Sequence, residues 1–151
     1  VLLKLAPDLE DDAALRAAEV ALEEGLRGLI LTNTTLSRKG LRSTIPEGAG
    51  GVSGRPVFSR STALLRAVAE RYRGKLALIG VGGIHDPADA EAKLRAGADL
   101  LQVYTGFIYG GPGFSRRILR ALVEQDALTA QLEGAAPPLL GGARGPAQSP
   151  P

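Results

Sequence analysis

The sequence predicts an α/β fold in which helices cover a sheet of parallel strands. Two observations support this prediction: four short apolar segments alternate with four segments of helical periodicity, and the apolar segments are almost continuous in Leu, Ile and Val. Alternating strands and helices are typical of parallel sheets, and continuous apolar strands are typical of strands buried on both faces. An open doubly wound sheet and half of a (β/α)₈ barrel both fit, since a whole barrel takes about 250 residues.

The first unit is a strand over residues 1–7 followed by a helix. Asp8 is the expected cap of this helix, because a carboxylate accepts hydrogen bonds from the free amides of a first turn. Gly25 is expected to end the helix. The apolar side chains at helical spacing, which we expect to be buried, are Leu15, Ala18 and Leu22.

The second unit is a strand over residues 28–34, a long loop and a helix over residues 61–72. The loop is rich in Gly, Ser and Pro, and it is too long for an idle connection in a compact domain, so we expect it to be functional. The expected buried face of the helix consists of Leu64, Leu65, Val68 and Tyr72.

The third strand is expected over residues 75–81, and Asp86 followed by Pro87 is a strong signal for the start of the next helix. Gly97 is expected to close that helix. The fourth strand is expected over residues 100–106. The apolar side chains of the last helix are Ile118, Leu119, Leu122 and Val123.

The chain is therefore divided into residues 1–127, the α/β unit, and residues 128–151, a flexible tail rich in Gly, Pro and Ala. The sequence has no cysteine, which excludes disulfides, thiolate metal sites and a cysteine nucleophile. The net charge of +2 is small and aromatic residues are sparse, so nucleic-acid binding is not expected. The chain opens on Val1 and has no methionine, and we expect it to be a soluble part of a longer protein.

Polar residues stand at the ends of the first two strands. Lys4 is a lone cation in an apolar strand, so it must reach solvent or a negative partner, and an anionic ligand at the strand ends is one such partner. Residues 32–35 read TNTT, which is either a simple turn or a ligand contact. Asn33 carries both donors and an acceptor, as a planar ligand with carbonyl and N–H edges requires.

The ends of the last two strands carry the most informative motifs, GVGG at residues 80–83 and YTG at residues 104–106. Barrel enzymes frequently bind phosphate through the loops after their last two strands. The backbone amides of Gly82, Gly83, Tyr104 and Thr105 are therefore candidates for one phosphate site. The sequence indicates a cofactor that carries phosphate.

Other candidates are weaker. The GGVSG segment at residues 50–54 permits close approach of the backbone to a ligand, or a plain turn. His85, the only histidine, is expected to be a solvated loop residue rather than a general base, and the GFSRR segment at residues 113–117 is expected to be a solvated helix start. No metal-binding cluster and no G-x-S-x-G nucleophile motif is present.

Taken together, VLLKLAPDL, LILTNTTLSR, GGVSGRPV, LIGVGGI and LLQVYTGFIYGGPG resemble the C-terminal half of a dihydroorotate dehydrogenase over about residues 1–124. The GVGGI and YTGFIYGGPG segments resemble class 2, the quinone-dependent branch. The resemblance implies a (β/α)₈ TIM barrel whose fifth to eighth strands are present here, with FMN at the carboxyl ends of the strands.

The resemblance also implies roles for individual residues. Lys4 matches a lysine beside the flavin ring, and Asn33 with Thr34 matches the orotate-binding pair. The residues that match FMN contacts are Lys4, Thr32, Ser53, Gly54, Gly82, Gly83, Tyr104 and Thr105.

The implied reaction oxidises (S)-dihydroorotate to orotate in pyrimidine biosynthesis, with FMN as cofactor and a quinone as electron acceptor. In class 2 enzymes the serine base and the helices that meet the membrane precede the matched segment. No catalytic residue is therefore assigned in this chain. The isolated chain is expected to be inactive and not to close a barrel, because its outer strands would be unpaired edges. The resemblance places the parent enzyme at the cytoplasmic side of the membrane.

Two alternatives remain open from the residues. One is another FMN-dependent TIM-barrel oxidoreductase with the same phosphate site. The other is a non-catalytic, phosphate-binding half-barrel that pairs with a partner chain.

Overall fold

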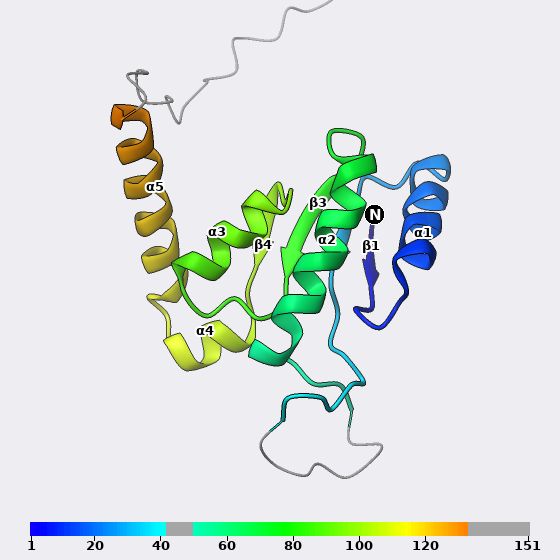
Figure 1. Cartoon of the computed structure of the whole chain (residues 1–151), viewed down its shortest axis with the longest axis horizontal. Helices are drawn as coiled ribbons and strands as arrows, with labels where there is room; N and C mark the ends of the chain where they lie inside the picture. The colour runs from blue at the N-terminus through cyan, green and yellow to red at the C-terminus, as the bar shows by residue number, and fades with distance from the viewer. Residues whose placement is uncertain (42–49, 133–151) are drawn as a thin grey trace, which may run out of the picture.

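The structure is a computed structural model that describes residues 1–41 and 50–132, and it is an α/β fold (Figure 1). Its elements, in chain order, are β1 (Leu2–Leu5), α1 (Asp11–Glu23), β2 (Gly28–Leu31), the 3₁₀ helix η1 (Arg55–Val57), α2 (Phe58–Tyr72), β3 (Ala77–Val81), α3 (Pro87–Arg95), β4 (Leu100–Gln102), α4 (Thr105–Gly110) and α5 (Phe114–Leu132).

The four strands form one parallel sheet in the order β1-β2-β3-β4. Lys4 pairs with Ile30, which pairs with Ile79, which pairs with Leu100. A doubly wound sheet reverses its strand order at a switch point, whereas a barrel keeps sequential order with the helices outside. The predicted fold class is confirmed: these are consecutive βα units of the barrel type, with α2 and α3 in front of the strands in Figure 1.

The hydrophobic core lies between the sheet and its helices. Leu29, Leu31 and Leu78 are fully buried there and pack with Leu64 and Leu65 of α2. Alternate residues point to the opposite face of the sheet, and on the two outer strands they are exposed: Leu2 is 41 % exposed and Leu100 is 60 % exposed. The expectation that the strands are buried on both faces was therefore wrong for β1 and β4, since no described residue covers that face.

Asp8 does not cap α1, which corrects the sequence prediction. The cap position is Glu10, and its side chain forms no capping hydrogen bond. The Asp8 carboxylate instead accepts hydrogen bonds from the Thr35 hydroxyl and the Leu36 amide, so it ties the loop after β1 to the loop after β2. Burial raises the pKa of Asp8, but these hydrogen bonds outweigh burial and lower the pKa overall.

The buried face of α1 also differs from the prediction. Ala14, Ala18 and Ala21 are buried, whereas Leu22 is 38 % exposed. Small side chains let α1 pack closely against the sheet and α2, and the larger Leu22 lies on the outer edge of that contact. The predicted helix end is consistent with the structure, because Gly25 follows α1 with a φ of +71°.

The start of α3 was predicted correctly. Asp86 is the N-cap residue, and its carboxylate accepts a hydrogen bond of 2.9 Å from the Asp89 amide, with Pro87 at the first helical position. Gly97 follows the helix with a φ of +105°, and an added Cβ there would lie 2.4 Å from the Cβ of Ala69 on α2. Gly97 therefore ends α3 and lets α2 approach it.

The last two helices depart from the sequence analysis. The short helix α4 was not predicted, and Phe114 of the GFSRR segment is only 3 % exposed, packed in a cluster with Ile84, Ala90 and Ile118. On α5 Leu119 is 63 % exposed and Val123 48 % exposed, which corrects their assignment to a buried face.

Helix α5 continues to Leu132, so its last residues fall in the segment assigned to the flexible tail. Residues 128–132 read LTAQL and contain no Gly or Pro, so nothing stops the helix there. Residues 133–151 of the predicted tail, and residues 42–49 of the predicted functional loop, lie outside the described residues. In the described ranges, no helix has the length and apolar character needed to cross a membrane.

Candidate functional site

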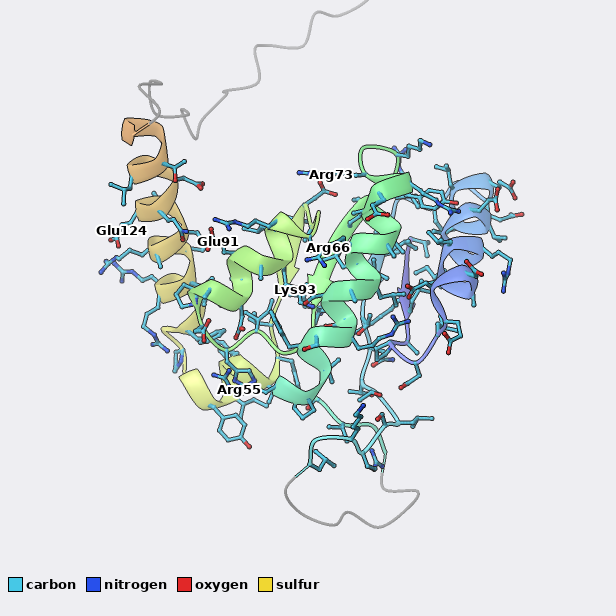
Figure 2. All side chains as sticks on the ribbon, in the orientation of Figure 1. Arg55, Arg66, Arg73, Glu91, Lys93 and Glu124 are labelled. Carbon is cyan, nitrogen blue, oxygen red and sulfur yellow. The ribbon has the colours of Figure 1, made fainter. Side chains whose placement is uncertain are left out.

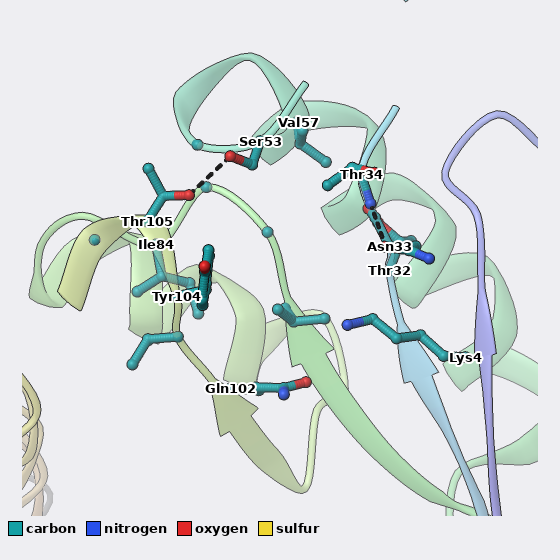
Figure 3. A pocket seen from close by; sticks show the side chains of 16 residues that line it. Lys4, Thr32, Asn33, Thr34, Ser53, Val57, Ile84, Gln102, Tyr104 and Thr105 are labelled. Atoms are coloured by element: carbon teal, nitrogen blue, oxygen red, sulfur yellow. Dashed lines mark hydrogen bonds between the residues drawn. The ribbon is translucent and has the colours of Figure 1, made fainter. Parts of the chain in front are cut away.

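A pocket lies at the carboxyl ends of the four strands (Figure 3). All ten residues that the sequence analysis named as site residues line it: Lys4, Thr32, Asn33, Thr34, Ser53, Gly54, Gly82, Gly83, Tyr104 and Thr105. The lining residues that it did not name are Val57, Val81, Ile84, Gln102, Val103 and Gly106. Parallel strands bring their carboxyl ends to one edge of the sheet, which is why residues from distant segments meet here.

The β1 and β2 side of the pocket is polar. Lys4 is exposed and extends across the pocket in the direction of Gln102 (Figure 3). It forms no ion pair with any described residue. Asn33 follows β2. Its backbone amide donates to the carbonyl oxygen of Leu5 at 2.7 Å, and its side-chain oxygen accepts a hydrogen bond from the backbone amide of Thr34 at 2.9 Å. Thr32 is buried, and its hydroxyl donates to the Asn33 carbonyl.

The turn after β3 is formed by Gly82 and Gly83, with φ of +105° and +78°. An added Cβ on Gly83 would lie 2.4 Å from the Cβ and 2.7 Å from the Cα of Phe58, the first residue of α2. The turn is thus packed directly against the start of α2, and no side chain fits between them. Only glycine meets both the backbone angle and the contact.

The β4 side brings a hydroxyl pair to the pocket. Thr105 begins α4, and its hydroxyl donates to the hydroxyl oxygen of Ser53 at 2.9 Å (Figure 3). Gly54 has a φ of +79°, and an added Cβ there would lie 3.2 Å from Cγ2 of Thr105. The loop before η1 is therefore held against the end of β4, and it closes this side of the pocket. Tyr104 is 73 % exposed at the rim.

The chemistry of the pocket favours an anionic ligand. Within residues 1–41 and 50–132, the backbone amides of Gly82, Gly83, Tyr104 and Thr105 have no hydrogen-bond acceptor. Unpaired amides at such turns bind phosphate or carboxylate oxygens. Lys4 adds a positive charge at the other side, and the described residues contain no carboxylate in the pocket lining and no cluster of metal-binding side chains.

Gln102 is a pocket residue that the sequence analysis missed. It is on the same face of β4 as Leu100, two residues earlier, and its amide lies opposite Lys4 (Figure 3). The sequence signal that could have identified Gln102 was its position: it is a polar residue at the carboxyl end of an otherwise apolar strand.

His85 is not a solvated loop residue, which corrects the sequence prediction. Its ring atom Nε2 is buried and has no hydrogen-bond partner among the described residues. A Cβ added to Gly54 would lie 3.6 Å from this atom, so the Gly54 backbone packs close to the ring. The His85 backbone amide donates to the Asp89 carboxylate at 2.9 Å. The loop before η1 folds over the ring, and only the tertiary contact buries it.

Lys93 of α3 was also missed, and it is the only charged side chain that is fully buried in the described part of the chain. Its Nζ donates to the Ser61 hydroxyl oxygen at 2.5 Å and lies 5.3 Å from the centre of the Phe58 ring. Burial lowers the pKa of Lys93 to about 7, against the attraction of Asp89, which raises it. The sequence signal was its spacing of three residues from the buried Ala90 and Ala96.

The pKa of Lys93 predicts a stability that increases with pH. The folded-state pKa is about 7 and the ordinary value is 10.5, so between these values the unfolded chain binds more protons and the free energy of unfolding rises with pH. Lys93→Met removes the buried charge, so we expect the variant to be more stable than the wild type at pH 7, by about 1–4 kcal/mol. The difference should shrink towards pH 10. Urea unfolding of both proteins across this range measures it, and parallel pH profiles would contradict the prediction.

The fold and the pocket together define a protein of the TIM-barrel type with a polar ligand pocket at the carboxyl ends of its strands, whose donors favour an anion. Comparison with known proteins makes the assignment specific. The family model described as dihydroorotate dehydrogenase matches residues 1–125, and the chain belongs to the dihydroorotate dehydrogenase family.

Curated relatives carry the name dihydroorotate dehydrogenase (quinone). The chain is 50 % identical to one from Cereibacter sphaeroides over 122 residues, which cover 81 % of this chain and 34 % of the relative. It is 52 % identical to one from Nocardia farcinica over 129 residues, 82 % of this chain and 35 % of the relative. The chain thus spans about a third of the length of the relatives it matches.

A solved structure of the dihydroorotate dehydrogenase of Eimeria tenella, in complex with ferulenol, superposes with a TM-score of 0.78 at 41 % identity. The match covers 86 % of this chain and 35 % of that one. The ligand-free structure of the same enzyme gives a TM-score of 0.77. The family resemblance and the barrel fold predicted from the sequence are confirmed.

Proposed function

We propose that this chain supplies FMN-binding residues of a quinone-dependent dihydroorotate dehydrogenase, an enzyme that oxidises (S)-dihydroorotate to orotate. One observation carries the proposal: residues from four separate strand ends, each named from the sequence, line a single pocket that has free amides on one side and Lys4 on the other. The names of the relatives support the substrate and the acceptor.

FMN fits the donor set of this pocket. The amides of Gly82, Gly83, Tyr104 and Thr105 would hold its phosphate, with the Thr105 hydroxyl as a further donor. Thr32, Ser53 and Gly54 would contact the rest of the cofactor. Lys4 would lie beside the ring, where a positive charge favours an anionic reduced flavin.

Asn33 and Thr34 would bind the substrate. The Asn33 side chain holds its oxygen on the Thr34 amide, which leaves its NH₂ group free to donate to a carboxylate or a ring carbonyl. The hydrogen bond from the Asn33 backbone amide to Leu5 fixes the turn from which both side chains project. An amide fixed in this way favours a planar ligand with oxygen acceptors, which describes orotate.

The described residues that line the pocket offer no general base. The polar groups of the described pocket lining are a lysine, hydroxyls, amides and a tyrosine, and the Ser53 hydroxyl oxygen is occupied by the Thr105 hydroxyl. We therefore propose that a residue outside this chain takes the substrate proton, and that the chain by itself does not turn over substrate. When bound, FMN would take the hydride from substrate and be reoxidised by quinone. A quinone acceptor implies a peripheral location at the membrane, which we propose on the cytoplasmic side.

The test is flavin and orotate binding by the purified protein. FMN should bind with quenched fluorescence and more tightly than riboflavin, which lacks the phosphate, and orotate should shift the absorption spectrum of the bound flavin. Asn33→Ala should retain FMN and lose the orotate shift. A protein that binds no flavin would overturn the proposal in favour of a non-catalytic half-barrel. Bound FMN that is insensitive to orotate would favour a different flavin oxidoreductase.

A further inference from the structure

Lys93 lies between α2 and α3, away from solvent (Figure 2). Removing an ammonium from water is costly unless it is paired, and Lys93 has no carboxylate within salt-bridge distance in the described part of the chain. Among the described residues, its one hydrogen-bond partner is the neutral Ser61 hydroxyl, at 2.5 Å. Asp89 lies one turn earlier on α3 and attracts the Lys93 ammonium electrostatically. Its carboxylate, however, accepts a hydrogen bond from the backbone amide of His85. The charge is thus incompletely compensated.

The residues that contact Lys93 are those that support the glycine turn of the pocket. The Ser61 hydroxyl lies 3.3 Å from the carbonyl oxygen of Gly82 and 3.1 Å from that of Phe58. An added Cβ on Gly82 would lie 3.0 Å from the Ser61 hydroxyl oxygen, and one on Gly83 would meet Phe58. A single layer, Ser61 and Phe58, therefore separates the ammonium from the turn.

We propose that Lys93 is a positioning residue for the phosphate site, acting from behind the turn. Through Ser61 its ammonium fixes the carbonyl of Gly82, and this fixes the peptide that carries the Gly83 amide. Its charge also compensates a phosphate bound on the pocket side. This inference rests on the proposed function, because it requires a phosphate at Gly82 and Gly83.

Lys93 can act on a bound phosphate at this distance because the layer formed by Ser61 and Phe58 has a low polarizability. The buried ammonium contacts the turn through the side chains of Ser61 and Phe58, so the attraction between Lys93 and an anion is screened much less than at the surface. The charge that folding leaves uncompensated is then compensated by the ligand. Asp89 does not remove this effect, because its carboxylate accepts a hydrogen bond from the His85 backbone amide and forms no salt bridge with Lys93 among the described residues.

The experiment compares FMN with riboflavin in Lys93→Met, which keeps a long apolar side chain and removes the charge. The dissociation constants are measured by flavin fluorescence. We expect Lys93→Met to weaken FMN binding by about tenfold or more and to leave riboflavin binding within about twofold, because riboflavin has no phosphate. Lys75→Met is the matched control: Lys75 is exposed at the other end of β3, and its loss should change neither constant.

A merely structural role for Lys93 would weaken both flavins alike, and equal FMN to riboflavin ratios in wild type and variant would overturn the inference. If the wild type itself binds the two flavins equally, the phosphate site fails and the inference fails with it. If Lys93→Met does not fold, Ser61→Ala tests the same link. It should weaken FMN selectively, and an unchanged ratio in that variant would also overturn the inference.

Discussion

Gly83→Ala is expected to reduce FMN affinity by about 100-fold or more. The residue has a φ of +78°, and its new Cβ would lie 2.4 Å from the Cβ and 2.9 Å from the backbone nitrogen of Phe58. A positive φ costs a non-glycine residue about 1–2 kcal/mol, and the clash with α2 adds about 1–3 kcal/mol. The turn must move away from α2, and the Gly83 amide moves with it. Titration of the protein with FMN measures the effect.

Gly74→Ala is the matched control for this prediction. Gly74 has nearly the same backbone angle, with a φ of +80°, but an added Cβ there meets nothing within 4 Å. It lies between α2 and β3, at the end of the sheet opposite the pocket. We expect Gly74→Ala to lower stability by about 1–2 kcal/mol and to leave FMN binding unchanged. If Gly83→Ala behaves like this control, the turn does not hold the phosphate.

In an enzyme that contains this chain together with the residue that takes the substrate proton, Lys4→Met is expected to lower turnover by about 100-fold. This is a typical effect of removing one electrostatic contact at a developing charge. Lys4 is exposed in this chain and has no ion-pair partner among the described residues, so a ligand ring over it would bring an unpaired cation out of water. Such a cation stabilises negative charge on the ring. The variant should still bind FMN, because the proposed phosphate donors lie on the opposite side of the pocket (Figure 3).

The diagnostic measurement for Lys4 is the midpoint potential of the bound flavin, which should become more negative in Lys4→Met. Each 1.4 kcal/mol of lost stabilisation corresponds to about 30 mV for a two-electron couple. Lys75→Met changes the net charge equally and should leave the potential unaltered. A potential that does not move in Lys4→Met, together with normal turnover, would place Lys4 away from the ring.

Lys4, which lines the pocket, and Lys93, which lies behind it, differ in how well the sequence alone could identify them. Lys4 was recognised because a cation in an apolar strand conflicts with its surroundings along the chain. Lys93 was missed because a lysine in a helix of mixed composition looks like any solvated residue. Its burial depends on the packing of α3 against Ser61 and Phe58, which lie more than thirty positions earlier in the chain.

The sequence by itself determined the alternation of four strands with helices, the parallel fold class and the residues at the strand ends, but not the short helix α4. It could do so because periodicity, glycine and helix-start signals act over a few neighbouring residues. Only the tertiary structure decided which groups are buried or paired. Asp8 binds the loop after β2 instead of capping α1, His85 lies under Gly54, and Lys93 stands behind the glycine turn. These outcomes depend on contacts between segments far apart in the chain, and burial and hydrogen bonding across such contacts leave no periodic trace in the residues themselves.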